Sequence, residues 1–169
     1  MFKVVWKLAK IAILFLFILF ILYIFVVQPT LLGGTSMEPS FKSGEFFLVD
    51  KITYRFSEPK RKDVIIYTKV NQDYGNMDYV GRIVGLPNEN ILVQKDRIEI
   101  NGNLLDEPYS NWSGWKNEKP LTIKLGTDEY LVLFDKRILV TEVVKRSQFV
   151  GRIFYRYWPS DRAGLITNQ

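Results

Sequence analysis

The sequence predicts a mostly β, antiparallel domain attached to a single N-terminal transmembrane helix. Residues 11–27, "IAILFLFILFILYIFVV", form an apolar run that contains neither a charge nor a proline. From about residue 45 onward, short runs rich in β-branched and aromatic residues alternate with turns, and no sustained helical periodicity is found after residue 28. With 169 residues, the chain has the length of one domain.

The apolar run fits a membrane anchor. It reaches the roughly 17 residues that a spanning helix needs at minimum. Lys3, Lys7 and Lys10 precede it, and the positive-inside rule then places residues 1–10 in the cytoplasm. A cleaved signal peptide is the alternative, but its apolar region would be only about 7–15 residues long and would end in a small-residue cleavage site. We expect a retained single-pass anchor over residues 11–27 and an extracytoplasmic β domain over residues 28–169.

The β-rich part divides into strands at turn residues. The "QKDR" segment can join two neighbouring runs, and Asn101 with Gly102 fits a primed hairpin turn, which needs positive φ. Residues 110–120 have strand-breaking composition and are expected to form a loop. The expected strands are residues 45–52, 63–68, 78–85, 90–94, 97–100, 121–125, 129–134 and 151–158.

Composition excludes several kinds of function. The formal charge is +5, but without the three lysines of the anchor it falls to 20 basic against 18 acidic residues, or +2. With no basic stripe either, we expect no nucleic-acid partner. The chain has no cysteine and no histidine, so it lacks disulfides and the commonest metal ligand and general base. We expect no metal and no cofactor.

The loop between the anchor and the first strand can present a hydroxyl. In "GGTSMEPSFKSGE", residues 33–45, two glycines free the backbone before Ser36 and a proline stiffens it afterwards. Eight residues separate Val27 from Ser36, so the serine lies within roughly 30 Å of the membrane end of the anchor. Judged from the residues alone, a serine that merely forms a turn remains the competing interpretation.

Four segments together resemble the signature boxes of type I signal peptidases, especially those of Gram-positive bacteria. They are "GTSMEPSFKSGEFFLVDK", "RKDVIIY", "DYVGRIVGLPNENILVQKDRIEINGNLLDEPY" and "RYWPSDRAGLI", in the family's order and over nearly the whole chain after the anchor. The resemblance implies a single-pass serine protease of the bacterial cell membrane with an outward-facing β-rich domain. Members of that family remove signal peptides from secreted proteins beside the membrane.

The resemblance also implies roles for individual residues. Ser36 falls on the nucleophile of the S-M-x-P pattern, and its backbone N–H is the expected oxyanion donor. Gly34 matches the glycine that often stands two residues before the nucleophile. The substrate-binding positions implied are Met37, Pro39, Tyr79 and Val80.

The family's base, however, is missing. In the family the strand reads Y-V-K-R-I-x-G-L-P-G-D and its lysine takes the proton of the serine, whereas Gly81 stands at that position here. A serine hydroxyl without an activating base is a poor nucleophile. Arg82 stays protonated and points to the other face of the strand. Lys62, which replaces the glycine of the R-G-D-V box, is the remaining candidate for a displaced base.

A second box departs from the family pattern as well. The G-D-N-R-x-x-S-x-D-S-R box, which supports the lysine, appears as "FDKRILVTEVVKR", residues 134–146. Asp135 and Arg137 remain as supporting residues. The serine becomes Val140, the second aspartate Glu142 and the last arginine Val144. The base and its support are therefore lost together.

Three functions remain open. The first is a non-catalytic accessory protein or chaperone that binds extended peptides or signal-peptide regions of secreted proteins. The resemblance extends this hypothesis to surface pilus assembly with pilin subunits as clients, because degenerate relatives occur in such loci. The second is an active signal peptidase that uses Ser36 with a displaced base, and the third is a decaying paralogue without a role.

Overall fold

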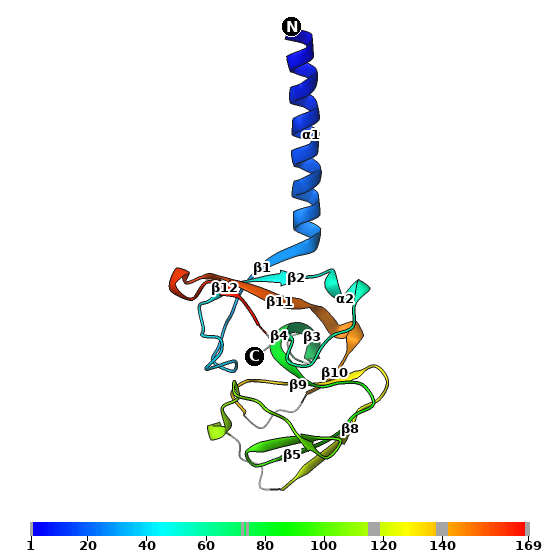
Figure 1. Ribbon diagram of the computed structural model, residues 1–169, viewed down its shortest axis with the longest axis vertical. Helices are drawn as coiled ribbons and strands as arrows, with labels where there is room; N and C mark the ends of the chain where they lie inside the picture. The colour runs from blue at the N-terminus through cyan, green and yellow to red at the C-terminus, as the bar shows by residue number, and fades with distance from the viewer. Residues whose placement is uncertain (1, 72, 74, 115–118, 138–141, 168–169) are drawn as a thin grey trace.

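A long apolar helix extends from a mostly β domain in the computed structural model (Figure 1), which describes all residues except 1, 72, 74, 115–118, 138–141 and 168–169. The helix, α1, spans Phe2–Val26, and its segment Lys3–Ile21 is long and apolar enough to cross a membrane by length and composition. The predicted N-terminal helix is thus confirmed, although it begins before residue 11. It passes directly into the first strand, and the Lys51 N–H donates a hydrogen bond of 3.0 Å to the Val26 carbonyl.

The larger sheet is antiparallel throughout the described residues. Its strand order is β1-β2-β11-β3-β4-β9-β10, with β12 paired to β11. Its strands are β1 (Val27–Leu31), β2 (Phe46–Asp50), β3 (Val64–Asn71), β4 (Gly75–Gly85), β9 (Glu129–Leu133), β10 (Glu142–Lys145), β11 (Phe149–Trp158) and β12 (Gly164–Leu165). Four antiparallel steps separate β1 from β4, so these two strands run in the same direction.

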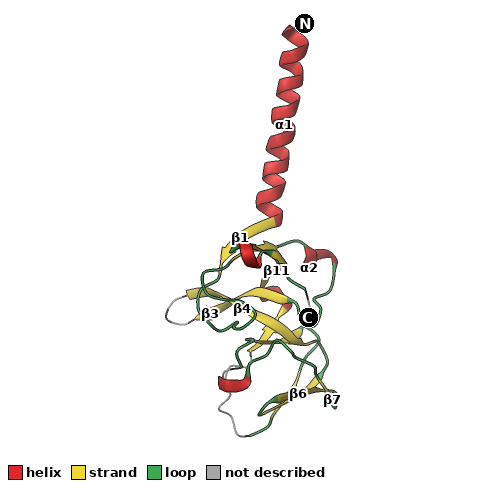
Figure 2. Cartoon of the chain, turned by 60° about the vertical axis from the view of Figure 1, so that its left-hand side comes forward, coloured by secondary structure: helices red, strands yellow, loops and turns green. Residues whose placement is uncertain are grey.

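A smaller antiparallel sheet has the order β7-β6-β5-β8. Its strands are β5 (Asn90–Gln94), β6 (Arg97–Ile100), β7 (Asn103–Leu104) and β8 (Leu121–Lys124). Asn101 and Gly102 have φ values of +50° and +81°, as the predicted primed turn requires. Figure 2 shows β6 and β7 at the end of the domain that is remote from α1.

The helical segments after α1 are short. They are α2 (Thr53–Phe56), which lies near the domain end of α1 in Figure 1, and the 3₁₀ turns η1 (Trp112–Gly114), η2 (Arg146–Gln148) and η3 (Ser160–Arg162). The predicted loop at 110–120 contains η1 and otherwise falls partly on residues 115–118, outside the described residues.

Strands β3 and β4 separate two apolar clusters, because alternate residues of a strand face opposite sides. The register pairs Ile66 with Val80 and Ile65 with Gly81. The Met37 cluster contains Leu32, Met37, Phe41, Phe47, Val49, Val64, Ile66 and Ile153, with Val80 and Phe134 packed against it. The Tyr67 cluster contains Ile65, Tyr67, Ile83, Tyr130, Val132 and Val144. Val80 and Gly81 therefore face different clusters.

All eight expected strands are found, as β2, β3, β4, β5, β6, β8, β9 and β11. The expectations missed β1, β7, β10 and β12. Strand β1 follows the apolar run without a break in composition and contains Pro29, which is tolerated because β1 is an edge strand. Strands β7 and β12 have two residues each, too few to show an alternating pattern.

Candidate functional site

A groove of about 410 Å³ lies between the first strand and the middle of the larger sheet. Its lining residues are Gln28, Thr30, Leu31, Leu32, Gly33, Ser36, Ile66, Asp78, Tyr79, Val80 and Phe134. One wall is thus β1 with the residues that follow it, and the other is β4. Ser36, Tyr79 and Val80, which the resemblance placed in one site, line this single groove.

Strand β4 offers a free backbone edge to the groove. Strand β3 pairs with the whole of β4, from Asn71 opposite Gly75 to Val64 opposite Arg82. On the other edge, β9 pairs only with Arg82, Ile83 and Gly85. Within the described residues, β4 therefore has no second partner strand between Gly75 and Gly81. Such an edge can bind an extended peptide through main-chain hydrogen bonds.

Ser36 is held by a tight turn of the loop. Gly34 precedes it with φ of +82°, a conformation that favours glycine. The Lys136 N–H donates to the Ser36 carbonyl at 3.0 Å, and the Phe41 N–H donates to the Met37 carbonyl at 3.0 Å. Within the described part of the chain, the Ser36 N–H makes no backbone hydrogen bond. That N–H is therefore available as the predicted oxyanion donor.

The other residues of the S-M-x-P pattern have different positions. Met37 is 1% exposed and packs in the core beneath the loop, so its role in the structure is to anchor the turn. Pro39 is exposed and is not part of the groove lining. Gly34 precedes the serine without lining the groove, whereas its neighbour Gly33 does line it.

The position of the missing lysine is buried and already filled. A Cβ atom built on Gly81 would lie 2.5 Å from Val132 Cγ1 and 3.4 Å from both Tyr67 Cε1 and the Leu133 carbonyl oxygen. Val132 and Tyr67 belong to the Tyr67 cluster, which also contains Val144, the residue that stands where the family box has its last arginine. The side chains nearest to position 81 therefore belong to an apolar cluster.

No lysine lines the groove among the described residues. Lys62, the candidate displaced base, is half-buried and its Nζ lies 5.9 Å from the Tyr109 ring centroid, outside the groove. The structure adds Lys136, whose backbone is bonded to Ser36 and whose side chain is half-buried. Lys136 was not among the predicted site residues, although it replaces the asparagine of the G-D-N-R box.

The supporting residues Asp135 and Arg137 form buried ion pairs with other partners. Asp135 accepts hydrogen bonds of 2.8 and 2.7 Å from Arg82 Nε and Nη2. Arg137 pairs with Glu107, whose pKa is raised above its ordinary value chiefly by burial. The Arg82 guanidinium lies 4.1 Å from the Tyr109 ring centroid. Asp135 therefore holds Arg82, which follows Gly81 in sequence but lies on the other face of β4.

Of the remaining positions of the degenerate box, the described ones lie on β10. Glu142 begins β10 and forms an exposed ion pair of 2.8 Å with Lys69. Val140 lies outside the described residues. In the described chain, no cluster of three or more Asp or Glu side chains is placed to hold a metal ion. Chemically, the site presents a serine hydroxyl beside an unpaired strand edge, and among the described residues no amine lines the groove.

The known proteins that this chain resembles are signal peptidases. The model of the signal peptidase family, peptidase S26, matches residues 5–158. The chain is 29% identical over 153 residues to a probable signal peptidase I-2 of Synechocystis, covering 85% of this chain and 69% of that protein. It is also 29% identical to signal peptidase IB of Staphylococcus aureus, covering 80% of each. A crystal structure of a signal peptidase I from Enterococcus faecalis aligns with 57% of this chain and 97% of that one, at 25% identity and a TM-score of 0.46.

Proposed function

The chain belongs to the signal peptidase S26 family, and we propose that it binds extended segments of exported proteins beside the membrane without cleaving them. Its role would be that of an accessory protein or chaperone in secretion or in surface pilus assembly, with pilin subunits among its clients. The observation that carries this proposal is the combination of an intact groove around Ser36 with a lysine position that Val132 occupies.

Binding without cleavage is physically coherent. Affinity for an extended segment would come from the free edge of β4 and from the apolar side chains of the groove lining, neither of which needs a base. Cleavage needs a group that accepts the proton of Ser36, and general-base assistance alone is typically worth about 10²–10⁴-fold in rate. The groove therefore keeps its binding elements while its lining lacks an amine.

The membrane topology is part of the same proposal. The helix α1 anchors the protein in the bacterial cell membrane as a single span, with residues 1–10 in the cytoplasm and residues 28–169 outside. Lys3, Lys7 and Lys10 support this orientation because positive charge concentrates on the cytoplasmic side.

The second candidate function is an active signal peptidase with a displaced base. Lys136 favours it most, because its N–H is bonded to the Ser36 carbonyl. Lys62 is the less favoured alternative, since its ammonium group lies by the Tyr109 ring. An activity that depends on either lysine would distinguish this function from the first.

The decisive experiment has a cleavage arm and a binding arm. The full chain in detergent is incubated in excess with a preprotein, next to an active signal peptidase as positive control. We expect no product, and we expect the double variant Gly81→Lys, Val132→Ala to remain inactive because Val144 leaves its amine without a polar partner. Product from the parent chain that disappears in Ser36→Ala would overturn the proposal, and loss in Lys136→Met or Lys62→Met would identify the base.

The binding arm measures the anisotropy of a labelled signal-peptide fragment. Thr30→Trp places an indole in the groove and is expected to abolish binding. Thr122→Trp, on an exposed position of β8 in the smaller sheet, is the matched control and is expected to bind like the parent. Equal binding by both variants would remove the groove from the proposal.

A further inference from the structure

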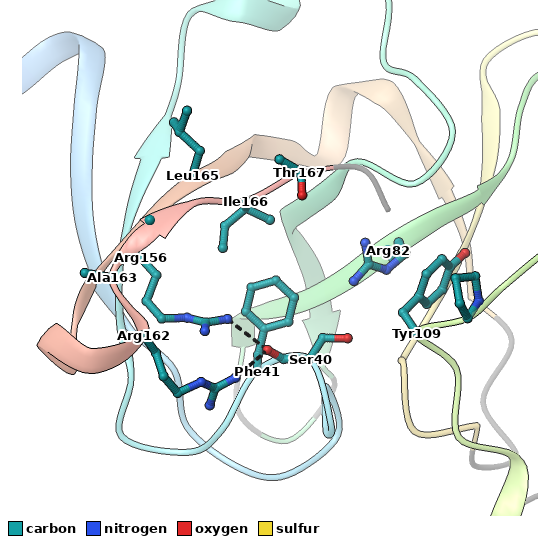
Figure 3. Close-up of a pocket in the computed structure, with 12 residues that line it drawn as sticks. Ser40, Phe41, Arg82, Tyr109, Arg156, Arg162, Ala163, Leu165, Ile166 and Thr167 are labelled. Atoms are coloured by element: carbon teal, nitrogen blue, oxygen red, sulfur yellow. Dashed lines mark hydrogen bonds between the residues drawn. The ribbon is translucent and has the colours of Figure 1, made fainter.

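A second cavity, of about 490 Å³, lies next to the serine loop and carries three arginines. Its lining residues are Ser40, Phe41, Arg82, Pro108, Tyr109, Arg156, Arg162, Ala163, Gly164, Leu165, Ile166 and Thr167 (Figure 3). Arg156 and Arg162 both lie in the segment "RYWPSDRAGLI", but the resemblance implied no role for either. We call this cavity the arginine pocket.

The arginine pocket has more positive than negative charge. Arg82 is balanced by Asp135. Arg156 and Arg162 share one carboxylate, that of Glu45: Arg162 donates to it, and Arg156 Nε lies 3.2 Å from its Oε2. In the described chain, no other carboxylate pairs with either of these two guanidinium groups. Among the described residues, the two guanidinium groups therefore share a single negative charge.

Arg156 also has unused hydrogen-bonding capacity. Its side chain is about nine-tenths buried, and its Nη2 donates to the Ser40 carbonyl at 2.8 Å, a bond drawn in Figure 3 beside that of Arg162 Nη2. Its Nε has no hydrogen-bond partner among the described residues, because the approach to Glu45 is misaligned. Burial lowers the pKa of the Arg156 guanidinium below its ordinary value. A buried cation in this situation is stabilised by an added anion.

Both walls of the groove lead to the arginine pocket. On the first wall, one helix-like turn connects Ser36 in the groove with Ser40 in the pocket. On the second wall, Val80 lines the groove and Arg82, about 7 Å further along the same face of β4, lines the pocket. Since β1 and β4 run in the same direction, a segment that lies between them and extends past Ser36 comes next to the pocket.

We propose that the arginine pocket receives the carboxylate of an acidic side chain, Asp or Glu, carried by the bound segment about two to four residues beyond the residue that faces Ser36. This inference rests on the proposed peptide-binding function. The pocket would act as a specificity site: it would select segments with an acidic side chain and fix the register in which they bind. A carboxylate there would neutralise the excess positive charge beside Arg156 and Arg162.

The test uses the full chain in detergent and short labelled peptides that span a secretory cleavage region. Each peptide is neutral apart from one Glu, which is moved stepwise along the sequence, and each has a Gln counterpart. We expect Glu to be preferred over Gln by about fivefold or more at one or two adjacent positions, because a charge-assisted hydrogen bond is roughly twice as strong as a neutral one. A preference that is equal at all positions would reflect only the net charge of the domain and would overturn the inference.

The exposed Thr167 gives a matched pair of variants that leaves the arginines intact. Thr167→Glu supplies a carboxylate from within the chain and is expected to abolish the positional Glu preference, whereas Thr167→Gln is expected to keep it. Persistence of the preference in Thr167→Glu would place the acidic side chain elsewhere. Nanodiscs with phosphatidylglycerol give a third arm: lipid binding weakened by Thr167→Glu, without any peptide preference, would assign the pocket to a lipid headgroup instead.

Different binding results would refute the arginine pocket and the proposed peptide-binding function. If no peptide binds, the groove itself is refuted and the inference falls with it. If peptides bind in a manner sensitive to Thr30→Trp but show no positional preference for Glu, only the arginine pocket is refuted.

Discussion

Replacing Gly81 with alanine should destabilise the protein because Val132 already occupies the space for a side chain. The added Cβ would lie 2.5 Å from Val132 Cγ1, well inside van der Waals contact. Overpacking of a core typically costs about 1–3 kcal/mol. The glycine does not have a positive φ, so alanine gains about 0.4–1 kcal/mol from the reduced entropy of the unfolded chain. The net expectation is a loss of about 1–2 kcal/mol, or a fall in Tm of roughly 3–6 °C.

A double-mutant cycle with Val132→Ala isolates the contact. Alone, Val132→Ala removes two buried methyl groups and should also destabilise, by about 1–3 kcal/mol. In the double variant the new Cβ at position 81 moves into the vacated space, so the two losses should not add. We expect a coupling of about 1 kcal/mol or more, against about 0.3–0.5 kcal/mol for independent sites.

The assay is thermal and urea unfolding of the full chain in detergent, followed by tryptophan fluorescence. Gly164→Ala is the matched control, because its Cβ would meet nothing within 4 Å and its φ is not positive; its effect should stay within about 0.5 kcal/mol. If Gly81→Ala were as neutral as Gly164→Ala, or if Val132→Ala failed to rescue it, the lysine position would not be filled and the argument from packing would be refuted.

Two further predictions concern topology and the buried ion pair. The chain has no cysteine, so a single introduced cysteine reports which side of the membrane it occupies. In intact cells Lys95→Cys should react with a membrane-impermeant maleimide, whereas Lys3→Cys should react only after lysis. The reverse pattern would refute the proposed orientation. Asp135→Ala should lower the free energy of unfolding by about 3–5 kcal/mol, because it leaves the buried Arg82 charge without its carboxylate. Lys69→Ala breaks an exposed ion pair with Glu142 and should lower the free energy of unfolding by less than about 1 kcal/mol in the same assay. Equal costs would show that the Arg82 charge is solvated.

Local sequence patterns were sufficient for the strands and for the hairpin turn at Asn101 and Gly102, because alternation and positive φ are properties of neighbouring residues. Local patterns did not place Ser36, Tyr79 and Val80 in one site. That prediction came from the family resemblance alone. Spacing along the chain does not reveal that Ser36 and Val80 line the same groove.

Other parts of the site depend on packing between distant segments, which no local pattern encodes. The contact of Val132 with position 81 arises from the pairing of β4 with β9. Glu45 pairs with Arg156 and Arg162, which lie more than 100 residues later in the sequence. Lys136 was overlooked because its importance comes from a backbone hydrogen bond to Ser36, and not from its side-chain chemistry.

If α1 spans the membrane as proposed, its direct passage into β1 and the hydrogen bond from the Lys51 N–H to the Val26 carbonyl place the domain at the end of the span. A connection without an intervening loop would limit how far the groove could move toward a distant molecule. The groove would then lie within about 3 nm of the bilayer surface. Exported chains would be met at the moment of emergence, so timing, and not side-chain chemistry alone, would decide which of them are captured.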